Sequence, residues 1–141
     1  MGRILAIDYG QKRVGIAVTD NLKIIATPLT TIHSKDIITF LKDYLSKEEV
    51  EVFVVGEAKR LNNEESDSTK FIEPFVNLLR KTFPLINIER IDERYTSKMA
   101  FQTMIDSGLK KKERKNKETV DVISATLILQ TYMSLKNNLN N

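Results

Sequence analysis

Residues 3–19 read Arg-Ile-Leu-Ala-Ile-Asp-Tyr-Gly-Gln-Lys-Arg-Val-Gly-Ile-Ala-Val-Thr, two apolar runs on either side of a polar turn. The first run, residues 3–8, ends in an acid and is typical of a buried central strand. Residues 13–19 have the composition of a second strand. Residues 24–32 predict a third, in which Pro28 marks an edge or an irregularity. The three together predict an antiparallel meander.

Beyond this meander, helical and strand-like segments alternate. Apolar residues at helical spacing predict helices within residues 37–45, 71–83, 96–107 and 119–135. In the second of these, Pro74 predicts a kink or a shifted helix start. Short apolar runs predict strands at 52–55 and 86–91. The order predicts an α/β fold: a five-stranded mixed sheet, antiparallel in its first three strands and then parallel, flanked by helices on both faces.

Composition restricts the class of protein. A chain of 141 residues with 41% hydrophobic residues suggests one globular domain, which we place at residues 1–136, followed by a disordered Asn-rich tail at 137–141. The chain has no cysteine, which excludes disulfides and thiolate sites. No apolar run approaches the roughly 20 residues that span a bilayer. We therefore expect a cytoplasmic protein without membrane contact.

Three acidic positions stand where acids are unusual. Asp8 ends the first strand, where a partly buried carboxylate is costly without a compensating cation, although an Asp before a turn can also be a simple cap. Asp92 and Glu93 follow the fifth predicted strand, and alternation leaves open which of them points inward. Asp121 lies among apolar residues of the last helix, with small residues one turn later at Ser124 and Ala125. Its structural alternative is an acid favoured by the helix dipole.

Three acids meeting at one sheet edge would suit hard divalent cations such as Mg²⁺ and Mn²⁺. Two such ions can activate a water and stabilise the leaving oxygen of a phosphodiester. The single histidine, His33, lies at a strand-to-helix junction and is interpreted as a surface residue, so histidine-based triads are poorly supplied.

Basic residues and glycines supply candidate phosphate contacts. Gly10 and Gly15 frame Lys12 and Arg13, which favours either close backbone approach to phosphate or plain hairpin geometry. Residues 110–117 hold six basic side chains and one acid, either a phosphate-binding segment or a solvated loop. The predicted substrate-binding residues are Gly10, Lys12, Arg13, Arg94, Lys110, Lys111, Lys112, Arg114 and Lys115.

Four blocks in this order resemble the YqgF (RuvX) family, whose members are RuvC-like proteins of the RNase H superfamily. The blocks are residues 7–17, Val55-Gly56, residues 92–97, and residues 120–129. The resemblance implies an RNase H-like fold and metal-dependent phosphodiester cleavage, with Asp8, Glu93 and Asp121 as catalytic metal ligands for Mg²⁺ or Mn²⁺, two ions in all. One departure is Gly56-Glu57-Ala58-Lys59-Arg60-Leu61-Asn62, where many relatives have Gly-Leu-Pro-Leu-Asn.

The resemblance further implies processing of the 5′ end of pre-16S rRNA, so the expected partner is nucleic acid, an rRNA precursor more than branched DNA. A Holliday-junction resolvase is the first alternative, and it would act as a dimer, whereas the nuclease can be a monomer or a homodimer. A non-catalytic nucleic-acid-binding factor is the second. An ATP-binding module of the actin and sugar-kinase type is the third, but it needs a second Asp-x-Gly hairpin, and Asp106-Ser107-Gly108 stands at the end of a predicted helix instead.

Overall fold

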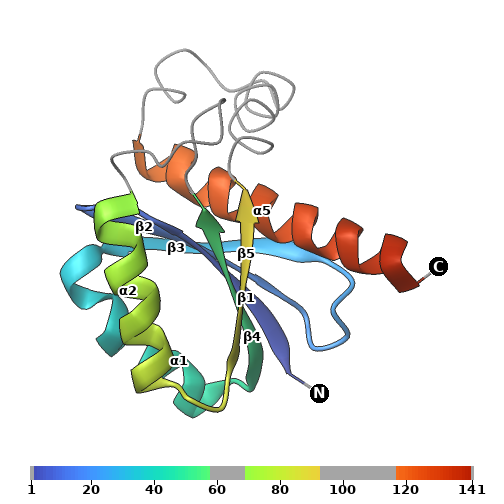
Figure 1. Cartoon of the computed structure of the whole chain (residues 1–141). Coiled ribbons are helices and arrows are strands. Elements are labelled where there is room, and N and C mark those ends of the chain that lie inside the picture. The colour runs from blue at the N-terminus through green and yellow to red at the C-terminus, as the bar shows by residue number, and fades with distance from the viewer. Residues whose placement is uncertain (1, 58–68, 93–116, 141) are drawn as a thin grey trace.

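The computed structural model describes residues 2–57, 69–92 and 117–140, which form a mixed sheet between two layers of helices (Figure 1). The strand order is β3-β2-β1-β4-β5. Strands β1 and β2 pair antiparallel, as do β2 and β3, while β4 pairs parallel with both β1 and β5. The five-stranded mixed sheet is therefore confirmed, and its strands are β1 (Arg3–Tyr9), β2 (Arg13–Thr19), β3 (Ala26–His33), β4 (Val50–Glu57) and β5 (Asn87–Asp92).

Helices cover both faces of the sheet, as predicted. One face carries α1 (Ile37–Lys47), which follows a short 3-10 turn at Ser34–Asp36, and α2 (Thr69–Thr82). The long helix α5 (Lys117–Asn140) crosses the other face and packs mainly on β2, with further contacts to β3 and β1 (Figure 1). Among the described residues, no helix is both long and apolar enough to cross a bilayer.

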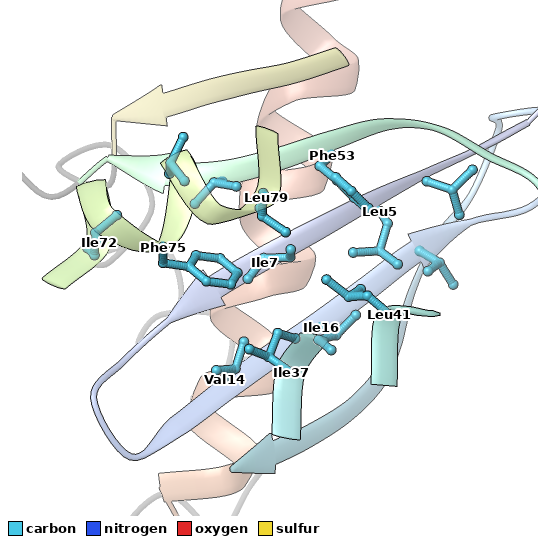
Figure 2. Packing of buried hydrophobic residues seen from close by; sticks show 14 residues of the cluster. Leu5, Ile7, Val14, Ile16, Ile37, Leu41, Phe53, Ile72, Phe75 and Leu79 are labelled. Atoms are coloured by element: carbon cyan, nitrogen blue, oxygen red, sulfur yellow. The ribbon is translucent and has the colours of Figure 1, made fainter. Parts of the chain in front are cut away.

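Each central strand is buried on both sides, which explains its continuous apolar run. On β1, Leu5 and Ile7 face α1 and α2, while Ile4 and Ala6 face α5. Figure 2 shows the first of these two cores, where strand side chains meet residues of α1 and α2. Fully burying one such aliphatic side chain contributes about 1.5–3 kcal/mol. The same alternation assigns every residue at the strand ends to one face or the other.

Several segment boundaries differ from the sequence prediction. Strand β3 begins at Ala26 instead of residue 24, because Asp20 Oδ1 accepts hydrogen bonds from the backbone N–H groups of Ile24 and Ile25 and holds them in the preceding turn. Helix α2 begins at Thr69 and runs through Pro74, so its start is not shifted to the proline. Helix α5 extends to Asn140, past the predicted end and into the segment expected to be a tail. The helix predicted at 96–107 lies outside the described residues.

An arginine on β5 ties the sheet to α2. Arg90 forms a two-pronged ion pair with Glu73, with nitrogen–oxygen distances of 2.8 and 2.9 Å. The same guanidinium donates to the carbonyl oxygens of Val55 and Gly56 at the end of β4, each at 3.2 Å. The hydrogen bonds from Arg90 hold the pKa of Glu73 below its usual value. The pair therefore fixes α2 beside the carboxyl end of β4.

We expect Glu73→Gln to lower the free energy of unfolding at pH 7 by about 0.5–1 kcal/mol, discounted because the Glu73 side chain is 44% exposed. A carboxyl group whose pKa is lowered by folding stabilises the fold at pH values above its pKa in the unfolded protein. This stabilisation is lost as the pH falls through its pKa in the folded protein. The difference between the two proteins in urea unfolding should therefore shrink as the pH falls below 4.5 and disappear once the pH is below the lowered pKa of Glu73. Asp43→Asn, which removes an exposed pair with Lys47, is the control and should change stability less. A Glu73 effect that persists unchanged at acid pH would contradict this interpretation.

Candidate active site at the carboxyl edge of the sheet

The carboxyl ends of the parallel strands bring three acids to one edge. Asp8 is the penultimate residue of β1, Glu57 ends β4, and Asp92 ends β5, where it is the register partner of Glu57. Ligand sites in open α/β sheets form outside this kind of edge. The sequence predicts Asp8, Gly56 and Asp92 at the ends of three strands, and all three lie at this edge, whereas Glu57 is not one of the predicted site residues.

The strand alternation divides these acids between the two faces. Asp8 continues the row of Ile4 and Ala6, which packs against α5. Asp92 follows Arg90, which pairs with Glu73 of α2, and it is adjacent to Ile91, which packs in the core beneath α5. Asp92 therefore lies on the α1/α2 face, opposite to Asp8, and so does Glu57. The question that the sequence left open is answered for Asp92: it does not share a face with Asp8.

A glycine brings α5 onto the sheet beside Asp8. Gly15 of β2 is the register partner of Asp8. A Cβ atom at Gly15 would lie 2.1 Å from the carbonyl oxygen of Asp121 and 2.5 Å from its carbonyl carbon. Only a residue without a side chain allows this approach. Asp8 and Asp121, which are 113 positions apart in the sequence, are consequently neighbours across one glycine.

The side of α5 that faces the sheet explains why Asp121 points to this edge. Ala125 and Ile128 are fully buried against the strands, and Asp121 precedes them by one and two helical turns on the same side of the helix. The small residue predicted to permit close helix approach, Ala125, is thus confirmed in that place. Asp121 ends this apolar side at the carboxyl edge with its side chain 21% exposed, half-buried but reachable by solvent.

Arg13 orients the Asp121 carboxylate. Its Nε donates a hydrogen bond of 3.0 Å to Asp121 Oδ2 across the contact between β2 and α5. The two side chains are only 37% and 21% exposed, so the pair is partly shielded from water. A carboxylate offers about four lone-pair sites on two oxygens, so one hydrogen bond from Arg13 is compatible with binding a cation as well. Arg13, predicted as a phosphate contact, here holds a predicted metal ligand.

The donor set around Asp8 fits a hard divalent ion. On the α5 face, Asp8 lies between two glycines. Gly15 of β2 is its register partner on one side, and Gly56 of β4 lies on the other, because Ile7 pairs with Val55. Neither of these two glycines has a side chain, so neither of them blocks the approach of a cation to the Asp8 carboxylate. Asp8 and Asp121 offer the oxygen donors that Mg²⁺ and Mn²⁺ prefer. Within the described ranges, no group of three side chains able to hold a metal ion is assembled.

The turn between β1 and β2 is held in place from both sides. Gly10 N donates to Arg13 O at 3.0 Å and closes the hairpin, and a Cβ atom at Gly10 would lie 2.8 Å from that same oxygen. Ser34 donates from its backbone N to Lys12 O at 3.0 Å, and its hydroxyl donates to Gln11 O. Of the two roles that the sequence allowed for Gly10, the structure shows the hairpin geometry. Lys12 is left exposed on a fixed turn beside Asp8.

Several predicted site residues lie outside the described residues, among them the third acid. These are Glu93, Arg94, Lys110, Lys111, Lys112, Arg114 and Lys115. His33 is exposed and its Nδ1 accepts a hydrogen bond from Lys35 N, which confirms its interpretation as a surface residue.

Two features of the edge had only faint signals in the sequence. In the sequence, Gly15 is one of a pair of glycines with Gly10, and nothing local indicates that it faces the backbone of Asp121. Arg90 stands in an alternating strand segment, Asn87-Ile88-Glu89-Arg90-Ile91, where a charged residue predicts only a solvated position. Its pairing with Glu73 depends on tertiary packing. One signal could have placed Asp121 on the side of the helix that faces the sheet: it lies four residues, about one helical turn, before the small residue Ala125.

Comparison with known proteins gives the same site a family context. Residues 2–135 match the protein family described as RuvX, Holliday junction resolvase. A protein of Flavobacterium psychrophilum is 62% identical over 136 residues, covering 96% of this chain and 99% of the relative. Relatives from Flavobacterium johnsoniae and Bacteroides thetaiotaomicron are 57% and 53% identical over the same length. All three carry the name "putative pre-16S rRNA nuclease".

A solved structure shares the fold. Thermus thermophilus RuvC, determined in complex with a Holliday junction substrate, superposes with a TM-score of 0.60 over 96% of this chain and 97% of its own, at 14% sequence identity. At this identity the likeness concerns the fold alone. The RNase H-like architecture expected from the sequence is thereby confirmed.

Proposed function

The chain belongs to the RuvX family, and we propose on that premise that it is a nuclease that hydrolyses phosphodiester bonds of structured nucleic acid with the help of divalent metal ions. The observation that carries this proposal is the placement of Asp8 and Asp121 together on the α5 face at the carboxyl edge, across Gly15. Two carboxylates so placed repel a phosphate unless cations stand between them. A binding protein without catalysis has no use for that arrangement.

Asp8, Asp121 and Glu93 would hold the ions. Glu93 is proposed in preference to Asp92 because Asp92 lies on the opposite face of the sheet from Asp8. Mg²⁺ or Mn²⁺, bound as two ions, would supply an activated water and a counter-charge for the leaving oxygen. Arg13 fixes the Asp121 carboxylate, and Lys12, on its anchored turn, is positioned to contact a phosphate next to the one that is cleaved. Arg94 and the basic residues at 110–115 are proposed as further phosphate contacts.

The substrate that we propose is the precursor of 16S rRNA, cleaved at its 5′ end in the cytoplasm. The names of relatives that are 53–62% identical over nearly the whole chain support this choice. A four-way DNA junction is the second candidate. It is favoured by the description of the family and by the shared fold with RuvC bound to such a junction. Symmetric cutting of a junction requires two active sites, so this alternative needs a dimer.

The experiment offers the purified protein both substrates, each with Mg²⁺, with Mn²⁺ and with EDTA. We expect cleavage of the rRNA precursor with either metal and none with EDTA. Cleavage of the junction alone would transfer the proposal to the resolvase, and sedimentation of the protein should then show a dimer. Tight binding of both substrates without cleavage under any metal would overturn the nuclease and leave a binding protein.

A further inference from the structure

A groove opens between α1 and α2 on the face of the sheet opposite to Asp8 and Asp121. Its volume is about 460 Å³, and α1, α2 and the end of β1 all contribute to its walls. The floor is apolar: Ile37 and Phe75 are buried, and Ile38 is half-buried. Leu78 lies at its margin with 46% of its surface exposed, a high value for a leucine beside a core. The helices therefore leave part of this apolar surface uncovered.

Aromatic rings form one wall of the groove. The ring of Tyr9 stacks on that of Phe75 with 4.1 Å between centroids and 10° between planes. Phe71 lies 6.2 Å from Tyr9 at an interplanar angle of 47°. Phe75 is buried beneath, whereas Tyr9 and Phe71 are only partly buried and line the open space. Such partly exposed rings, backed by a fixed third ring, form a stacking platform for planar groups.

The charged residues at the rim are both cationic. Lys35, from the turn before α1, and Lys70, from the first turn of α2, line the groove from opposite sides, and both are exposed. None of the described residues that line the groove is acidic. An apolar peptide or a helix would gain nothing from two lysines without a counter-charge. A single strand of nucleic acid carries one phosphate per base, so its bases can stack on the aromatic rings while its phosphates contact the two lysines.

The groove is joined to the candidate active site through β1. Tyr9 follows Asp8 directly, so their Cα atoms are about 3.8 Å apart while their side chains lie on opposite faces of the sheet. Ser34, another lining residue, is the one that anchors the Gln11-Lys12 turn. A strand of nucleic acid that passes over the carboxyl edge at Asp8 would enter the groove within a few nucleotides.

We propose that the groove between α1 and α2 binds unpaired nucleotides of the substrate strand next to the cleaved phosphate. Their bases stack on Tyr9 and Phe71, and Lys35 and Lys70 contact their phosphates. The inference rests on the proposed function for the identity of the strand. It makes the protein selective for substrates with a single-stranded flank beside the cleavage site.

The first test measures binding without catalysis. A fluorescein-labelled single-stranded RNA of about ten nucleotides, a length within the usual range for such sites, is titrated in EDTA and followed by fluorescence anisotropy. Phe71→Leu keeps apolar bulk but removes the ring, and we expect about 10-fold weaker binding. Phe40→Leu is the matched control, because Phe40 is also partly buried on α1 and stacked, with Tyr44, but is not part of the groove. It should bind as the wild type does.

The lysines are tested by salt dependence. Replacing both Lys35 and Lys70 by Ala should reduce the slope of log affinity against log salt by about 1.4, from two lost phosphate contacts to a single strand. Lys42→Ala together with Lys47→Ala, further along the exposed side of α1, is the control and should leave the slope unchanged. Unaltered affinity and slope in both the Phe71 and the lysine variants would overturn the proposal. So would failure of the wild type to bind the single strand.

The second test separates this inference from the nuclease itself. Two precursor RNAs are compared, one with an unpaired flank beside the cleavage site and one without. We expect Phe71→Leu to raise KM about 10-fold for the flanked RNA only, with kcat unchanged. If neither RNA is cleaved but the single strand binds in a Phe71-dependent way, the groove stands and the nuclease proposal fails. If both are cleaved and Phe71→Leu behaves as wild type, the groove proposal fails alone.

Discussion

Asp8→Asn is expected to reduce the rate of RNA cleavage by at least about 100-fold and to leave the fold intact. The substitution keeps the size of the side chain but replaces a negative carboxylate by a neutral amide, which cannot balance the charge of a divalent ion. Residues that only support a metal ligand already cost about 10- to 100-fold when lost, so a direct ligand should cost at least as much. Asp8 is flanked on its face by Gly15 and Gly56, and neither glycine carries a side chain that could replace the lost carboxylate.

The measurement is single-turnover cleavage in Mg²⁺, paired with thermal unfolding of both proteins. Asp20→Asn is the control: Asp20 lies in the turn before β3, where it accepts hydrogen bonds from Ile24 and Ile25. That variant removes a negative charge far from the carboxyl edge, keeps an oxygen that can accept these two hydrogen bonds, and should cleave at the wild-type rate. Wild-type cleavage by Asp8→Asn would remove Asp8 from the metal site.

Gly15→Ala is expected to impair both stability and cleavage although it adds only a single methyl group and removes no metal ligand. The new Cβ would lie 2.1 Å from a backbone oxygen of Asp121, where real Cβ atoms keep at least 3.0 Å, so α5 must retreat by about an ångström. Overpacking of this kind costs about 1–3 kcal/mol of stability. A 1 Å misplacement of a catalytic group can cost about 100-fold in rate.

The loss of rate has to be distinguished from general destabilisation. Ile72→Val, in the core beneath α2, serves for comparison, since Ile72 is buried, does not line the groove between α1 and α2, and the change costs about 0.5–1.5 kcal/mol. At a temperature where both variants are fully folded, Ile72→Val should cleave normally and Gly15→Ala should not. Equal rates in the two variants would show that the contact between Gly15 and Asp121 does not position the site.

Much of the fold could be predicted because its signals are local. The runs 3–8 and 13–19 are apolar on both sides and end at polar turns, and the structure has strands there with almost the same bounds. The start of β3 differed because it depends on a side chain acting across a turn, that of Asp20. Such a contact is invisible to periodicity because it replaces strand hydrogen bonds with a local cap.

Asp8 and Asp121 could be proposed as site residues from the sequence because acids are costly in apolar surroundings, but their arrangement could not be predicted. Both lie at the edge where strands end, and their role as metal ligands stays a prediction. That Asp92 faces away could not be read from the sequence, because alternation needs one residue of known facing, here Ile91 packed under α5. The contact of Gly15 with Asp121 joins residues 106 positions apart, and only the packed helix reveals it.

The most direct test of the proposed site is to locate the bound ion itself. Mn²⁺ broadens NMR signals of nearby nuclei, so the assigned amide spectrum is recorded while Mn²⁺ is added to the wild type and to Asp8→Asn. We predict that broadening in the wild type is strongest around Asp8, Gly15 and Asp121, and that Asp8→Asn needs much more Mn²⁺ for the same effect. Broadening centred elsewhere, or equal in the two proteins, would contradict a divalent metal site held by Asp8 and Asp121.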